Sequence, residues 1–271
     1  MFIFVWKEVY KLVNQLEYKQ KKMSVGQWFI DLWILVRIQY ANVREQWILI
    51  IVLASLFPLT TLMLLHFFVE NPTNEMILRI VTGNMVFALI ITGINLLAQD
   101  LSWQKHRGHF VFYATLPISK VSFIYANLIK GIITSFPSFL ILAIIGEIIY
   151  DLNWSFHWFI IPLILLSILS IVGFGVFIGF WSPSPQVTNI VLPSLMMFLG
   201  FLTPVLIDSS QLPKILYWLS LIFPTTYVAE ALRELLSNGL TKGVIINSVI
   251  LVVFTIVSYF LILKNIKWRI E

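Results

Sequence analysis

The sequence contains no cysteine and few charged residues. The missing cysteines exclude disulfides, thiolate metal sites and thiol catalysis. Charged residues make up 11% of the chain and hydrophobic residues 59%. A soluble domain has about 25% charged residues. This balance predicts an integral membrane protein.

Sequence motifs of common catalytic and nucleotide-binding sites are also absent. No glycine is followed by lysine, so the chain has no P-loop and no nucleotide site of its own. No histidine is followed by glutamate, which excludes the HExxH zinc motif, and GxSxG does not occur. No pair of carboxylates lies inside one apolar run, as a proton relay would need. We therefore expect neither catalysis nor a bound metal or cofactor on this chain.

Long apolar runs account for most of the chain. A helix that crosses a bilayer needs about 20 mostly apolar residues. Six segments meet this requirement: residues 47–69, 77–99, 121–150, 156–181, 187–207 and 244–263. The sequence thus predicts an all-α integral membrane protein with six transmembrane helices. Residues 47–271 would form the membrane domain, and residues 1–46 would precede it.

Basic residues flank the apolar runs at alternate ends. Most of them lie in the N-terminal region, in the loop after the second span and at the C-terminus. Cytoplasmic loops carry such an excess, so we expect both termini of this multi-pass cell-membrane protein in the cytoplasm. A bacterial origin is also expected, although the charges do not decide it. The net charge of +5 is then a topology signal, and no nucleic-acid partner is expected.

Residues 1–46 are predicted not to cross the membrane. Residues 27–40 combine aromatic and aliphatic side chains with Asp31 and Arg37, which suits a helix lying in the inner interface of the bilayer. A helix packed on a protein partner fits this pattern nearly as well. The first 23 residues carry a run of lysines that would meet anionic lipid or a cytoplasmic subunit.

The loop after the second span, residues 98–120, is the largest on the inner side. Aromatic residues alternate with polar ones there, which favours short amphipathic helices. Gly108 is expected to cap one helix, and Ser119 to cap the third span. A short helix carrying Lys105, His106, Arg107 and His109 would present a cationic, aromatic surface. That surface either docks a soluble partner or is simply a solvated positive-inside loop.

The stretch after the fifth span is too polar to cross the bilayer. Residues 212–240 hold four charged side chains among apolar ones. Pro213 and Pro224 can each open a helical piece, because proline suits the first turn of a helix. This favours a re-entrant helical hairpin that dips into the outer face between the fifth and sixth spans.

Two features inside the spans have a structural interpretation. Lys130 lies about two to three turns into the third span. A charge facing a polar pathway is one explanation, and a side chain that reaches back to the inner interface is the favoured one. Gly173, Gly175 and Gly179 in the fourth span predict close approach of a neighbouring helix.

Three stretches carry a resemblance to a known family. They are Asp100 with His106-Arg107-Gly108 and Leu116-Pro117-Ile118-Ser119, then residues 199–204, and then residues 212–233 including Phe223-Pro224-Thr225-Thr226-Tyr227. Together they resemble the ABC-2 type transporter permeases, the transmembrane subunits of ABC exporters. The third stretch is the most specific. Gln104, Lys105 and His109 depart from the residues usual in the family's loop.

The resemblance implies a function and partners. Two permease subunits, identical or different, would surround a shared pathway. Each would dock a cytoplasmic ABC ATPase that holds the ATP and magnesium. The chain itself would be no enzyme, and it would move a hydrophobic or amphipathic substrate outward, such as a drug, peptide or lipid-linked molecule. The alternative is a non-transporting assembly, sensor or immunity component that binds a partner through its inner loop.

The resemblance also implies roles for residues. The ATPase-coupling loop would comprise Asp100, Trp103, Lys105, His106, Arg107, Gly108, His109 and Pro117. The outer re-entrant hairpin, expected to cap the pathway, would comprise Pro213, Phe223, Pro224, Tyr227, Glu230 and Arg233.

Overall fold

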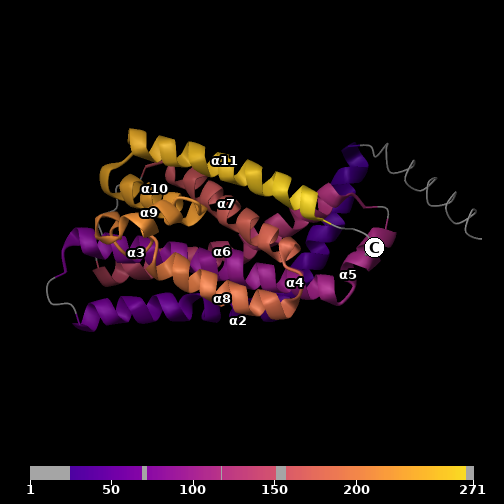
Figure 1. Ribbon diagram of the computed structural model, residues 1–271, viewed down its shortest axis with the longest axis horizontal. Coiled ribbons are helices and arrows are strands. Elements are labelled where there is room, and N and C mark those ends of the chain that lie inside the picture. The colour runs from indigo at the N-terminus through magenta and orange to yellow at the C-terminus, as the bar shows by residue number, and fades with distance from the viewer. Residues whose placement is uncertain (1–24, 69–71, 117, 151–156, 267–271) are drawn as a thin grey trace, which may run out of the picture.

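The computed structural model describes residues 25–68, 72–116, 118–150 and 157–266, which form helices and no strand (Figure 1). The helices are α2 (Val25–Phe68), α3 (Asn74–Leu89), η1 (Ile90–Leu96), α4 (Leu97–His106), α5 (His109–Thr115), α6 (Lys120–Tyr150), α7 (Ile160–Trp181), α8 (Pro185–Phe201), η2 (Ser209–Gln211), α9 (Lys214–Ser220), α10 (Pro224–Asn238) and α11 (Lys242–Asn265). The predicted all-α membrane fold is confirmed. The amphipathic segment expected before residue 24 lies outside the described residues.

Five helices among the described residues are long and apolar enough to cross a membrane. They are Gly26–Leu64, Asn74–His106, Lys120–Tyr150, Ile160–Trp181 and Lys242–Asn265. Each contains or overlaps one of the predicted spans. The predicted fifth span is the shorter apolar helix α8, which has 17 residues. A sixth long crossing exists only if the bent pair α9 and α10 is taken as one span.

Helix α8 stops at Phe201, before the predicted end of the fifth span at residue 207. Thr203 precedes Pro204, and a residue before proline is biased away from the helical conformation. The irregular backbone beyond the helix is buried against α3, where the Val205 carbonyl lies against Gly83. Protein therefore covers this non-helical segment, as irregular backbone at membrane depth requires.

The second span is the central helix of the bundle. It comprises α3, η1 and α4 in one run of 33 residues, about 50 Å long at 1.5 Å per residue. Residues 81–94 are all buried, as expected for a helix that is apolar on every side. Helices α2, α6, α7, α8 and α10 contact this run, and in Figure 1 α2 and α11 lie along opposite edges of the bundle.

The middle of this central helix is the π-helix η1. Gly175 of α7 lies so close that a Cβ there would collide with the backbone oxygen of Gly93. Thr92 donates a hydrogen bond to the Ser135 hydroxyl of α6 at 2.9 Å. The close helix approach predicted for Gly175 is therefore present, and it occurs at the one π-helix of the described residues.

Helix α2 joins the predicted interfacial segment to the first span. It runs without a break across the predicted boundary at residue 46. In Figure 1 its indigo start crosses the view steeply near α5, and its later part follows the length of the bundle. Asp31, Leu35, Gln39 and Val43 are buried at intervals of four residues, which places them on one face of the helix.

Candidate functional site

The predicted inner loop forms the end of α4, a turn and the short helix α5. Helix α4 continues to His106 because Ala98 and Leu101 pack against α7 at Gly179. Gly108 then adopts a φ of 78°, a left-handed conformation that glycine tolerates best. Its predicted capping role is confirmed. The four basic residues expected on one short helix are instead divided between α4, the turn and α5.

We call the exposed side chains around this turn the tip surface. It comprises Trp103, His106, Arg107, His109, Val111 and Phe112. The Arg107 guanidinium lies 5.4 Å from the centroid of the Trp103 ring, which is a cation–π contact. Phe112 is 61% exposed. Exposed aromatic and arginine side chains of this kind are enriched where proteins bind one another.

The tip surface rests on a buried aromatic cluster. Phe110 and Tyr113 point inward from α5, whereas Phe112 points outward. The Phe110 ring centroid lies 5.3 Å from that of Phe180 on α7, and that of Tyr113 lies 5.0 Å from Phe123 on α6. These contacts fix α5 on two long helices, so the tip surface is held by the bundle.

Lys105 is directed toward the bundle, not toward the tip surface. Its ammonium donates to the carbonyl oxygens of Phe180 at 3.2 Å and Ser182 at 3.0 Å. Carbonyls at the end of a helix lack partners within it, and a cation there is favourable. Lys105 therefore ties α4 to the end of α7.

Asp100 and Lys130 meet at a partly buried junction behind the tip surface. The Lys130 ammonium lies 2.5 Å from the Asp100 carboxylate and 3.2 Å from the amide oxygen of Gln39. Gln104 donates to the same carboxylate at 2.6 Å. Lys130 is therefore held by partners on α2 and α4. The junction joins α2, α4 and α6.

The end of the predicted loop leads directly into α6. The amide of Ser122 donates to the Ser119 hydroxyl at 3.0 Å, so Ser119 caps α6 as predicted. Pro117, assigned to the coupling loop from the sequence, lies outside the described residues.

Helices α9 and α10 form the predicted hairpin at the opposite end of the bundle from α5 (Figure 1). The two helices are bent by 94° at the break between them. Pro224 is the first residue of α10 and Pro213 directly precedes α9, so both prolines open helical pieces as predicted. The Tyr227 hydroxyl donates to the carbonyl of Leu221 at 3.0 Å and holds the bend.

The hairpin is attached to α7 and α8. The Phe223 ring centroid lies 5.9 Å from that of Phe174 on α7 and 5.7 Å from that of Phe198 on α8. Arg233 donates to the carbonyl of Val205, in the irregular segment after α8, at 3.1 Å. Glu230 is half-buried on the same helix. Of the sequence-predicted hairpin residues, Phe223 and Arg233 thus connect the hairpin to its neighbours.

An ion pair links the hairpin end to the central helix. Arg79 of α3 pairs with Glu75 at 2.8 Å and with Asp208, which precedes η2. The Ser210 amide, 2.8 Å away, donates to Asp208. Together with the Ser210 hydroxyl and the Arg79 charge, it lowers the pKa of Asp208 to about 2. This carboxylate is therefore ionised at neutral pH.

A family model described as ABC-2 type transporter matches residues 30–237, which is more than half of the chain. The chain belongs to this family. The resemblance inferred from the sequence is confirmed, and the chain is a multi-pass membrane permease, a transport component that is not itself catalytic. The match includes both the tip surface and the hairpin. A search of curated proteins found no match.

Some residues of this permease's site were missed in the sequence. Val111 and Phe112 belong to the tip surface but were not chosen as candidates, because both look like core residues. Their exposure follows from the helical period, which turns Phe110 and Tyr113 inward. Gln39 was also missed. A lone amide on a buried stripe of α2 is the signal that could have found it.

Proposed function

We propose that this permease is the membrane subunit of an ATP-driven exporter and that the tip surface docks a separate ABC ATPase. The observation that carries the proposal is the cluster of exposed cationic and aromatic side chains on a turn fixed by the bundle. Trp103, Arg107 and Phe112 are the side chains best suited to enter a pocket of the partner. The partner ATPase binds the ATP and magnesium.

The central helix offers a mechanical link between the two ends of the permease. Its α4 end carries the tip surface, and its α3 end carries Arg79, which pairs with Asp208 beside the hairpin. Closure of two docked ATPases moves the α4 ends, and the rigid helix carries that movement to the hairpin. In this proposal the hairpin caps the outer end of the pathway.

The proposed pathway lies between two permease copies and carries a hydrophobic or amphipathic substrate outward. Both termini and the tip surface are cytoplasmic in this arrangement, in a bacterial cell membrane. The placement of the lysines and arginines supports this orientation. The large exposed apolar area of α2, α8 and α11 supports contact with lipid and with a second copy.

Co-purification from the native host tests this function. We expect an ABC ATPase to accompany the tagged wild-type permease. The double variant His106→Ala/Arg107→Ala should lose at least about tenfold of the bound ATPase, as expected when interface hot spots are truncated. The control Arg37→Ala/Lys120→Ala removes two exposed cations outside the tip surface and should retain it.

Each contrary result has a distinct meaning. Equal ATPase recovery with the tip variant and the control would show that the tip surface is not the docking site. If no ABC ATPase accompanies the wild-type chain, the exporter proposal fails. A non-ATPase partner in its place would favour an assembly, sensor or immunity component.

A further inference from the structure

A groove between α2 and α6 lies apart from both the tip surface and the hairpin. Its volume is about 220 Å³. From α2 it is lined by Tyr40, Arg44, Trp47 and Ile51, and from α6 by Pro137 among others. The transport mechanism proposed above uses none of these side chains.

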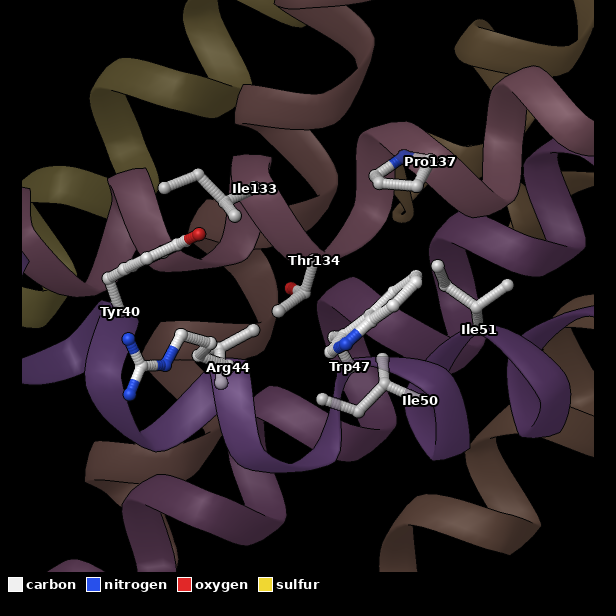
Figure 2. Close-up of a pocket in the computed structure, with 9 residues that line it drawn as sticks. Tyr40, Arg44, Trp47, Ile50, Ile51, Ile133, Thr134 and Pro137 are labelled. Atoms are coloured by element: carbon white, nitrogen blue, oxygen red, sulfur yellow. The ribbon is translucent and has the colours of Figure 1, made fainter.

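The groove is polar at one end and apolar at the other. Figure 2 shows the Arg44 guanidinium beside Tyr40 at one end, and Ile51 and Pro137 at the other. The Trp47 ring lies between them and points into the groove. Because residues three and four apart share a helix face, Tyr40, Arg44, Trp47 and Ile51 form one continuous stripe on α2. The stripe therefore grades from cationic to aliphatic.

The length of α2 places this polarity change at a membrane boundary. A hydrocarbon core about 30 Å thick spans about 20 residues of helix. Counted back from the end of α2 at Phe68, this core reaches Trp47. Arg44 then lies about one turn further, at the level of the lipid head groups. Tryptophan and tyrosine are enriched at this depth, which agrees with Trp47 and Tyr40.

The charge of Arg44 has no partner within the described part of the chain. Arg79, Lys130 and Arg233 each bind a carboxylate or a carbonyl oxygen, whereas Arg44 makes no hydrogen bond or ion pair with any described residue. Its neighbour Glu45 does not share its helix face, because consecutive residues of a helix point in different directions. An exposed guanidinium above an apolar groove complements an anionic head group with an acyl chain.

We propose that this groove binds one anionic phospholipid from the leaflet on the tip-surface side. The lipid phosphate pairs with Arg44 and accepts a hydrogen bond from the Tyr40 hydroxyl. One acyl chain follows Trp47, Ile51 and Pro137 toward the centre of the bilayer. The site holds a resident lipid, and it does not depend on ATPase docking or on transport.

Native mass spectrometry of the purified full-length permease tests the head-group contact. The protein is given phosphatidylglycerol or phosphatidylcholine with identical acyl chains. Wild type should retain phosphatidylglycerol about fivefold better than phosphatidylcholine, because one cation near an anionic head group has an effect of about this size. Arg44→Ala should abolish this preference. The control Arg37→Ala removes an exposed arginine of the same helix outside the groove, and it should keep the preference.

A second pair of variants tests the acyl-chain contact. Ile133→Trp fills the groove from α6 and leaves Arg44 in place, so the bound phosphatidylglycerol should fall at least about fivefold, to the level of Arg44→Ala. Val52→Trp adds the same ring to an exposed position outside the groove and should change nothing. Glycerol phosphate, which has the head group without the chains, should not displace the lipid.

The proposal is overturned if wild type retains both lipids equally or if Arg44→Ala keeps the preference. It is also overturned if Arg37→Ala loses the preference as fully as Arg44→Ala. Retention of lipid by Ile133→Trp, or displacement by glycerol phosphate, would show that no acyl chain occupies the groove. None of these readouts involves an ATPase, so failure here is separate from failure of the exporter proposal.

Discussion

Charged side chains inside this bundle are held by specific partners, and those partners come from distant parts of the chain. Lys130 is bound by Asp100 and Gln39, and Arg233 is bound by the Val205 carbonyl. Burying a charge costs free energy unless it is paired and hydrogen-bonded. These residues therefore link α2, α4 and α6 near one end of the bundle, and α10 with the segment after α8 at the other.

Replacing Arg233 should harm the permease more than replacing Lys214. Arg233→Ala leaves the buried Val205 carbonyl without its donor, which costs about 1–3 kcal/mol. Lys214 is exposed at the start of α9, so Lys214→Ala should change stability by less than about 0.5 kcal/mol. Thermal unfolding in detergent measures both. Equal and negligible effects would contradict the role given to Arg233.

The two partners of the partly buried junction should respond unequally to substitution. Asp100→Ala leaves the buried Lys130 ammonium with Gln39 alone, so we expect a loss of about 3 kcal/mol in stability. Lys130→Met keeps the volume, and the Asp100 side chain is 41% exposed and can be hydrated. We therefore expect Lys130→Met to lower the stability by only about 1 kcal/mol. Thermal unfolding of each variant measures the difference, and a larger loss for Lys130→Met would refute the asymmetry.

Single residues were the hardest level to predict from sequence. Features that follow local residue preferences were predicted: the prolines that open the hairpin helices, the Ser119 cap and the Gly108 turn. The pairing of Lys130 with Asp100 was not predicted, because Asp100 lies 30 residues earlier on another helix. Lys105 was assigned to a docking surface because its charge alone gave no sign of the α7 carbonyls that bind it. Such partners depend on tertiary packing.

At the level of elements, the second span differs most from the sequence prediction. It continues through the first part of the predicted loop to His106, because packing on α7 continues beyond the apolar run. Helix α8 differs in the opposite direction. It is shorter than the predicted span, because Pro204 ends the helix inside an apolar run. The length of the apolar runs therefore predicts where the spans lie. Packing on α7 determines where the second span ends, and Pro204 determines where α8 ends.

The crossing of α7 with η1 predicts unequal effects at two nearby glycines. Gly175→Ala should destabilise the permease by about 1–3 kcal/mol, because its Cβ would meet the Gly93 backbone, which cannot move aside. Gly173→Ala is the control. Its Cβ would lie 3.3 Å from the Ser258 side chain, which a small shift relieves. Thermal unfolding compares the two, and an equal loss would show that this crossing is not tightly packed.

For the whole molecule, the proposed function requires that the tip surface faces the cytoplasm. The chain has no cysteine, so single-cysteine variants need no altered background. Ser210→Cys, exposed at the hairpin end, should react with a membrane-impermeant thiol reagent applied outside intact cells. Thr115→Cys, exposed at the end of α5, should react only after the cells are opened. The reverse pattern would overturn the orientation.

The most direct test of the central claim is crosslinking from the tip surface in native membranes. A thiol-reactive photocrosslinker is attached to Thr115→Cys, beside Phe112, and in parallel to Ser210→Cys at the other end. If the tip surface docks the ATPase, illumination should join an ABC ATPase to Thr115→Cys and none to Ser210→Cys. An ATPase adduct at Ser210→Cys, or no ATPase adduct at Thr115→Cys, would contradict the account.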